Sequence, residues 1–233
     1  MKNLKYDLMF AAVIAVIFLP FVFSGDAYQW YINTNREHML LMAFGKFAIL
    51  ATLGEMLGLR IKTGNYTEPN FGMFPRAVVW GILGVWIASA MKIFGSGTPI
   101  LVQGLGVDSL VDAMKGAFTA KKLFGAFCIS TAMNICYAPV FMTVHKITDA
   151  HILQNKGSIK SLIRPMPVSD IISSLNWRVL WGFVFKKTIP LFWIPAHTLT
   201  FSLPSDFQVL SAALLSIALG VILAIAAVMG KKK

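Results

Sequence analysis

The chain has 233 residues, of which 57% are hydrophobic and only 13% are charged, and its mean hydropathy is +0.69. A soluble domain carries about 25% charged residues, so this composition excludes an ordinary soluble fold and indicates a membrane protein. The net charge of +11 does not indicate nucleic-acid binding, because the basic residues lie between apolar runs and not in a patch with stacking aromatics. They fit better as topology determinants that face an anionic membrane surface.

Four apolar runs in the first two thirds of the chain have the length of a membrane span, which needs about 20 residues. The first run, residues 8–23, follows Lys2 and Lys5. A cleaved signal peptide is the alternative interpretation of this run. The sequence from Phe23 to Asp26 is a poor cleavage site, so we expect a retained signal-anchor helix. The next three runs are residues 39–59, 74–94 and 123–144.

The last apolar region, residues 188–229, is too long for one span and is interrupted by Pro190, Pro195 and Pro204. Pro204 is followed by Ser205 and Asp206, a pattern that predicts the end of one helix and the N-cap of the next. Residues 206–229 then form a full span. Residues 189–203 form either a short, kinked span or a re-entrant arm.

The positive charges favour six spans over five. Six spans place the two basic loops, residues 60–76 and 145–188, on the same side as the lysines at both termini, whereas five would put the terminal lysines outside. We therefore predict an all-α, polytopic transmembrane helical bundle of about six spans, with the fifth span short and proline-broken. The whole chain, residues 1–233, forms one transmembrane domain with both termini cytoplasmic.

Glu55 is the clearest ionisable residue inside a predicted span, where such residues are costly and often functional. Its helical neighbours Ala51, Thr52 and Gly58 form a small, polar face that should turn toward other helices or water. We expect Glu55 and Thr52 to line a pore or cavity. The alternative is a structural acid paired with a lysine or arginine of another helix. Lys46 faces the opposite side and is expected to snorkel to the outer interface.

Polar residues in the proline-interrupted segment are the second candidate group, because broken helices at membrane depth often mark permeation or substrate sites. The alternative is a kinked packing helix whose hydroxyls bond its own carbonyls. In the fourth run, Asn134 fits a helix–helix hydrogen bond as well as a site. The pore- or cavity-lining candidates that join Glu55 and Thr52 are Asn134, His197, Thr198, Thr200 and Asp206.

Basic residues at the cytoplasmic ends of the spans are expected to hold an anionic lipid or solute at the inner mouth. These residues are Arg60, Lys62, Arg76, Lys186 and Lys187. His145, Asp149 and His151 lie close in sequence, but we interpret them as a solvated loop edge. No phosphate loop, zinc-protease motif or nucleophile elbow occurs, so we expect no catalytic residue, no metal and no cofactor.

Residues 37–229 resemble the Mpv-seventeen or twenty-two-kilodalton peroxisomal membrane protein family. The resemblance rests on Gly54-Glu55 in the first matching span, on Arg76 at the start of the next, and on the stretches 193–196 and 200–204. In the last stretch, Thr200 replaces the asparagine of the family signature. The resemblance implies a small helical bundle with pore-like or metabolite-handling behaviour and no established enzymatic activity. Residues 1–36 are then an added signal-anchor helix and loop.

Three functions compete at this stage. The leading hypothesis is a small pore or transporter-like protein for small polar solutes or metabolites. The second is a non-conducting scaffold or a lipid- or partner-binding protein, and the third is a membrane-embedded enzyme. The expected partners are membrane lipids and small polar solutes but no nucleic acid, and an oligomer is left open. The lysine-flanked first span favours a bacterial inner membrane.

Overall fold

The computed structural model describes residues 4–230, and it describes side chains through residue 218 and at Val221. Lys2 and the terminal lysines 231–233, on which the predicted topology partly depends, lie outside the described residues. The described residues are all-helical, as predicted. The elements in chain order are α1 (Leu4–Phe23), α2 (Gly25–Glu37), α3 (Met39–Thr63), α4 (Met73–Gly104), α5 (Leu110–Lys115), α6 (Ala120–Cys136), α7 (Ala138–Gln154), η1 (Ile159–Leu162), α8 (Val168–Ser174), α9 (Trp177–Val179), η2 (Leu180–Trp193), α10 (Ile194–Ser202) and α11 (Ser205–Gly230).

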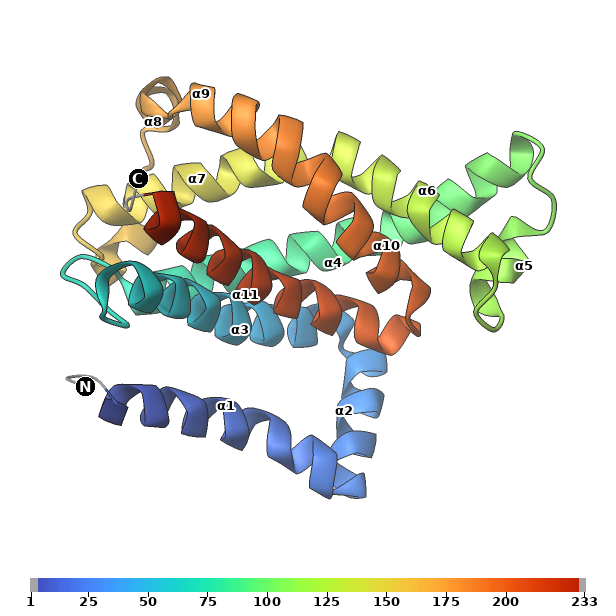
Figure 1. Ribbon diagram of the computed structural model, residues 1–233, viewed down its shortest axis with the longest axis horizontal. Helices are drawn as coiled ribbons and strands as arrows, with labels where there is room; N and C mark the ends of the chain where they lie inside the picture. Colours follow the sequence, from blue (N-terminus) through green and yellow to red (C-terminus); the bar gives the residue numbers. More distant parts are fainter. Residues whose placement is uncertain (1–3, 231–233) are drawn as a thin grey trace.

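The helices form an elongated bundle in which α3 and α11 lie side by side and α4 packs against α3 (Figure 1). A second unit, made of α6 and α10, packs on α4 through α6. Helix α1 lies along the outside of the bundle, is joined to it through α2 (Figure 1), and contacts α3 through the Asp7–Arg60 ion pair. The start of α1 and the end of α11 lie at one end of the molecule (Figure 1).

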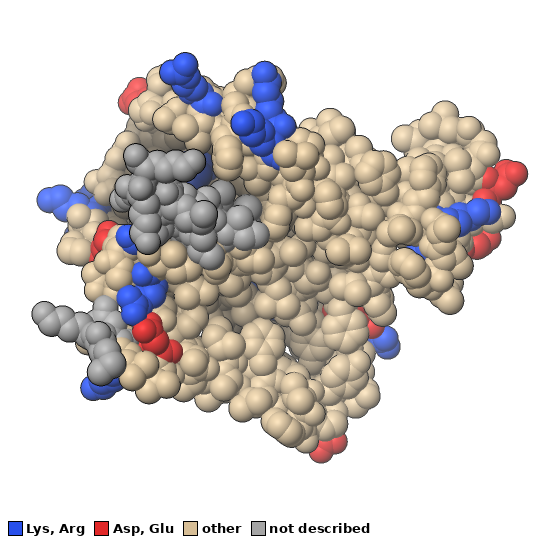
Figure 2. Space-filling model, viewed as in Figure 1, with Lys and Arg blue, Asp and Glu red and all other residues tan. Residues whose placement is uncertain are grey.

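Charged residues gather toward the ends of the molecule, and on the face in Figure 2 a broad uncharged belt lies between them. We call the end that holds the C-terminal ends of α3 and α7 the basic end. It carries the exposed residues Lys62, Lys146, Lys156 and Lys160. An apolar belt between charged ends is the surface expected of a protein that crosses a bilayer.

Three helices, α1, α3 and α4, are long and apolar enough to cross a membrane among the described residues. The pair α6 and α7, which bends by 48° at Tyr137, makes a fourth if it counts as one span. The structure therefore supports a helical membrane protein with three to four candidate spans, and it does not establish the predicted six.

The segment predicted to be a short, proline-broken fifth span is a continuous helix in the structure. The π-helix η2 contains Pro190 and passes directly into α10, whose first turn holds Pro195. Each proline lacks an N–H to donate, so the helix continues through these positions without those hydrogen bonds. The predicted break at Pro204 is confirmed, since α10 ends at Ser202 and α11 begins at Ser205.

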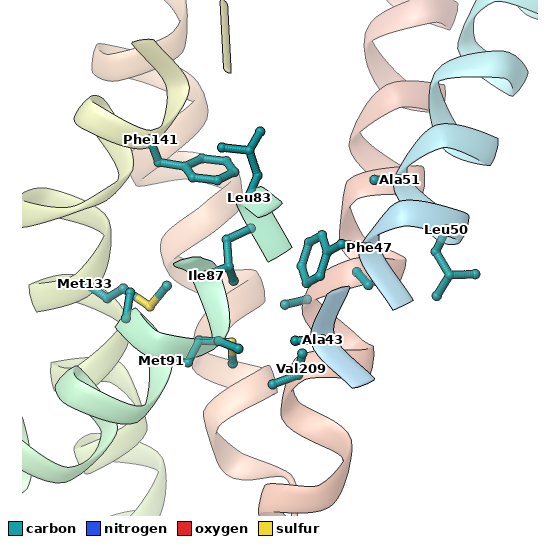
Figure 3. Packing of buried hydrophobic residues seen from close by; sticks show 14 of the residues in the cluster. Ala43, Phe47, Leu50, Ala51, Leu83, Ile87, Met91, Met133, Phe141 and Val209 are labelled. Atoms are coloured by element: carbon teal, nitrogen blue, oxygen red, sulfur yellow. The ribbon is translucent and has the colours of Figure 1, made fainter. Parts of the chain in front are cut away.

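The main core lies where α3, α4, α6, α7 and α11 meet, and Phe47 is its largest fully buried side chain (Figure 3). In lipid, helices associate mainly through close packing, which requires small residues at their crossings. Gly81 and Gly84 supply them, because a Cβ at Gly81 would overlap the Phe44 ring and one at Gly84 would overlap Phe47. Gly54 does the same toward α11, where a Cβ would lie 3.0 Å from the Ile217 Cα.

A polar cluster ties α2 to the start of α11 at the end opposite the basic end. Arg36 donates to both carboxylate oxygens of Asp206, at 2.7 to 3.2 Å, and Tyr31 and Asn35 donate to its backbone oxygen. Burial raises the pKa of Tyr31 to about 12, so its hydroxyl stays protonated and can donate. The expected snorkelling of Lys46 is wrong, because its buried Nζ donates to Asn35 Oδ1 at 2.5 Å.

The glycine contact between α3 and α4 makes a first testable prediction. Gly84→Ala should lower the free energy of unfolding by about 1–3 kcal/mol, because the added methyl group overpacks the Phe47 contact. Gly97→Ala is the matched control on the same helix, since a Cβ there meets no atom within 4 Å. Thermal unfolding in detergent micelles, followed by circular dichroism, measures both. Equal unfolding temperatures for the two variants would contradict the close packing of α3 and α4.

Candidate functional site

An arginine bridges three helices near the basic end. The Arg76 Nη1 of α4 donates to Glu55 Oε2 of α3 at 2.7 Å and to Asp149 Oδ1 of α7 at 2.5 Å. Its Nε donates to the backbone oxygen of Phe71 at 2.7 Å. The arginine side chain is 8% exposed, and each carboxylate side chain is 20% exposed. The pairing therefore lies largely out of contact with solvent.

The loop before α4 positions Arg76 locally. Gly72 adopts a left-handed backbone with φ 68° and precedes the first turn of α4. A Cβ at Gly72 would lie 2.7 Å from the Gly157 Cα, so only glycine lets this loop pack on the turn after α7. This close approach holds the Phe71 carbonyl beside the Arg76 guanidinium and the start of α4 beside the end of α7.

Glu55 has two further polar neighbours. The indole Nε1 of Trp80 donates to Glu55 Oε1 at 3.0 Å, and His145 Nε2 lies 3.4 Å from the same oxygen. The Trp80 and His145 rings are also in contact, with centroids 4.4 Å apart. His145 Nε2 lies 3.7 Å from Asp149 Oδ1, so the imidazole is placed between both carboxylates. The result is a compact set of one permanent cation, two acids, one histidine and one indole donor.

The pairing of Glu55 with Arg76 matches the structural alternative weighed for that residue, an acid paired with an arginine of another helix. It also corrects the role expected for Arg76. Its charge is taken up by two carboxylates of the same chain, so it is not a free cation for an anionic lipid or solute. Two basic residues at the end opposite the basic end also have polar partners within the chain. Lys46 donates to Asn35, and Arg36 pairs with Asp206.

Glu55, His145 and Asp149 have the residue types of a metal site, with ligand atoms within 4.8 Å of one another. The Arg76 guanidinium bonds two of these three ligands, so a divalent cation would have to displace a permanent positive charge. The geometry fits an internal ion pair better than a metal. His151 takes no part, because its Nε2 lies 3.0 Å from the backbone oxygen of Ser161.

One cavity of about 660 Å³ begins at this cluster and continues into the bundle. Along α3 its lining runs from the exposed Lys62 to the fully buried Phe47, a distance of about 22 Å at roughly 1.5 Å per residue. The lining residues are Phe47, Ala51, Gly54, Glu55, Gly58, Leu59, Lys62, Glu68, Pro69, Phe71, Arg76, Trp80, Ile87, Met133, Asn134, Tyr137, Ala138, Phe141, Met142, His145, Lys146, Asp149, Leu153, Val179, Leu180, Phe183, Val184, Thr188, Trp193, His197, Ala212 and Ser216.

The structure brings three of the predicted lining residues, Glu55, Asn134 and His197, to this one cavity. Asn134 Nδ2 lies 3.1 Å from His197 Nδ1, which links α6 to α10. Of the basic residues expected at the inner mouth, Lys62 lines the cavity at its exposed end, and Arg76 lines it as part of the ion pair.

Four predicted lining residues are placed elsewhere. Thr198 and Thr200 bond backbone oxygens of their own helix, Ile194 and Ala196, as the packing-helix alternative expected. The Thr52 hydroxyl is buried without a hydrogen-bond partner among the described residues and does not line the cavity. Asp206 pairs with Arg36 at the opposite end.

Three basic residues expected at the inner mouth are also outside the cavity lining. Arg60 makes two 2.7 Å hydrogen bonds with the Asp7 carboxylate of α1, so this arginine ties α1 to α3. Lys186 and Lys187 are exposed on η2, and Lys186 lies over the Trp181 ring. They remain available to a membrane surface but not to the cavity.

His145 and Asp149 are the site residues that the sequence interpretation missed. The apolar run ends at residue 144, which predicts a solvated loop for both residues. Helix α7 in fact continues to Gln154. The available signal was the spacing of four between His145 and Asp149, which puts both side chains on one helical face.

Comparison of the chain with known proteins gives no match to a family model, to a curated protein or to a solved structure. The resemblance of residues 37–229 to the Mpv-seventeen family therefore stays a prediction. The case for function rests on the geometry of the cavity and its ion cluster.

Removing the bridging cation tests how strongly the cluster holds the bundle. Arg76→Leu should lower the free energy of unfolding by about 3–5 kcal/mol, because it leaves two buried carboxylates without their cation. The triple variant Arg76→Leu, Glu55→Gln, Asp149→Asn should recover much of this loss, since no buried charge remains unpaired. Lys186→Leu, an exposed site, is the control, and unfolding in mixed micelles is the measurement. If Arg76→Leu were as stable as that control, the bridge would not hold the helices.

Proposed function

We propose that this chain is a small, transporter-like integral membrane protein that takes a solute or metabolite into the central cavity. The single observation that carries the proposal is the continuity of that cavity. It joins exposed residues at the basic end, such as Lys62 and Lys146, to the half-buried His197 and the buried Phe47 deep in the bundle. A non-conducting scaffold has no need of such a path.

The inner boundary of the cavity favours a carrier over an open pore. Phe47, Ile87 and Met133 line its deep part and belong to the buried core. Among the described residues of α3, none before Phe47 lines the cavity, and Ala43 and Val209 pack beyond that point (Figure 3). A cavity that opens at one end and is sealed by packed side chains at the other is the arrangement of an alternating-access protein.

The topology proposed with this function has six spans and a cytoplasmic basic end, in a bacterial inner membrane. Two observations support it. The start of α1 and the end of α11 lie at one end of the molecule, as an even number of spans requires (Figure 1). That end also carries the exposed lysines of the two basic loops, in keeping with the bias of cytoplasmic loops toward Lys and Arg.

A lipid-binding protein is the second candidate, and one feature of the cavity favours it. Most of the lining is apolar or aromatic, and Val179 and Phe183 are exposed where η2 borders the cavity. A lipid chain could enter beside these residues. The two candidates differ in whether the ligand crosses the membrane.

Solute flux in liposomes tests the transport proposal. The purified chain should raise the uptake of one or more members of a panel of uncharged metabolites above that of empty liposomes. Glu55→Gln keeps the shape of the side chain but removes its charge, so it should lower this uptake about tenfold, which corresponds to about 1.4 kcal/mol. Glu37→Gln, an exposed change outside the cavity, should have no effect.

Two outcomes would overturn the proposal. One is uptake no faster than in empty liposomes for every solute, with correctly folded protein. The other is uptake that Glu55→Gln leaves unchanged.

Cysteine labelling tests the orientation. In a background with Cys128 and Cys136 replaced by serine, Lys160→Cys at the basic end should react with a membrane-impermeant maleimide only in inside-out vesicles. Lys115→Cys on α5, near the opposite end, should react in intact cells (Figure 1). Labelling of Lys160→Cys from outside intact cells would reverse the proposed orientation.

A further inference from the structure

The cavity has two chemically different halves. Every Lys, Arg, Asp and Glu among its described lining residues belongs to the mouth at the basic end, together with His145. The inner half is lined by Phe47, Ile87, Met133, Asn134, Trp193 and His197, and it contains no such charged side chain among the described residues. A ligand that reaches the inner half therefore leaves the charged groups behind.

The hydrogen bonds of Asn134 fix the protonation of His197. Asn134 Nδ2 donates to the backbone oxygen of Ser130 at 2.9 Å, which identifies the amide nitrogen as the atom on this side. The same nitrogen lies 3.1 Å from His197 Nδ1, so Nδ1 must accept. The imidazole is then neutral and carries its proton on Nε2. Among the described residues, Nε2 has no hydrogen-bond partner.

Two neighbouring donors also lack partners. The Trp193 Nε1 and the Tyr137 hydroxyl are buried without a hydrogen-bond partner among the described residues. The Trp193 ring lies against the His197 ring, with centroids 5.1 Å apart, and Tyr137 follows Asn134 by one helical turn. Of these groups, the half-buried His197 lines the cavity, so its unpaired Nε2 is the donor that an acceptor inside the cavity can reach.

These features define the chemical class of ligand that the inner half can hold. An anion would lose its hydration without meeting a cationic side chain, and an organic cation would lose its hydration without meeting a carboxylate. The inner walls are otherwise aliphatic and aromatic, and a volume of about 660 Å³ lies within the range of pockets for drug-sized molecules.

We propose that the inner half of the cavity binds an uncharged, largely apolar molecule through a carbonyl-type oxygen that accepts a hydrogen bond from His197 Nε2. The site rests on the proposed function, because the ligand is the cargo of the same cavity. It replaces the small polar solute expected from the sequence with a more apolar one. Asn134 holds the imidazole in the donating tautomer, and the Trp193 ring packs against it.

Benzophenone, a neutral aromatic ketone that attaches to nearby C–H bonds under near-ultraviolet light, is a suitable probe. Two matched compounds carry a charge on the same body: 4-benzoylbenzoate is an anion, and (4-benzoylbenzyl)trimethylammonium is a cation. Each is irradiated with the full chain in lipid nanodiscs, and the attached peptides are mapped by mass spectrometry. Met133 and Met142 line the cavity and report its occupancy, whereas the exposed Phe124 and Phe127 report labelling from lipid.

Benzophenone should label Met133 and Met142 several times more than either charged compound does, relative to Phe124 and Phe127. His197→Leu removes the donor and should lower this labelling about three- to tenfold, as expected for the loss of one hydrogen bond. His197→Gln, which retains an N–H donor, should recover part of it. His151→Gln changes a buried histidine outside the cavity and should leave the labelling unchanged.

Three results would overturn the proposal. They are equal or stronger labelling of Met133 by a charged compound, labelling that His197→Leu does not change, and benzophenone labelling confined to Phe124 and Phe127. The comparison of the three compounds uses the unmodified chain, so it remains decisive if His197→Leu fails to fold. Labelling by a charged compound together with solute flux would reject the ligand class and keep the transport function. Neutral labelling without any flux would keep the ligand class and favour the lipid-binding candidate.

Discussion

The ion pair of Arg76 with Glu55 and Asp149 is the constraint on which the rest of the bundle depends. A guanidinium cannot lose its proton, so a buried arginine must find acceptors or carry a cost of several kcal/mol. Here the acceptors come from two other helices, which fixes α3, α4 and α7 relative to one another at the basic end. At the opposite end, the ion pair of Arg36 and Asp206 holds α2 against the start of α11.

Between these two polar ties the helices are held by close packing, because lipid removes most of the hydrophobic drive for helices to associate. Packing is closest where Gly81 and Gly84 admit the rings of α3. It is looser between this unit and the helices η2 and α7, which face α3 with large side chains such as Phe141 and Trp193 across the cavity. The cavity thus lies between α3 and the helices η2 and α7, which is also where a relative movement of these helices would open or close it.

Much of the helical plan follows from the apolar pattern of the sequence, but contacts between distant helices do not. The start of α3 at Met39 and the break at Pro204 were predictable, since run length and proline chemistry act locally. The sequence predicted, as one alternative, that Glu55 pairs with a lysine or arginine of another helix, but it did not identify Arg76 as that residue. Pro139 and Pro190 mark the places of the 48° bend at Tyr137 and of the π-helix but do not fix their geometry, and the burial of Lys46 depends on its contact with Asn35 of the preceding helix.

The division of the cavity into a charged mouth and a neutral interior assigns different tasks to its two polar groups. At the mouth, acids and bases neutralise one another within the chain, so the net field on an entering molecule is small and neither charge sign is strongly selected. The inner half of the cavity therefore determines which ligands bind, because aromatic side chains and a few hydrogen-bond donors replace water there. A site built in this way discriminates by the penalty for burying a charge rather than by attraction to one. Glu55 then acts by holding the mouth ordered, while His197 acts on the ligand and Asn134 acts through His197.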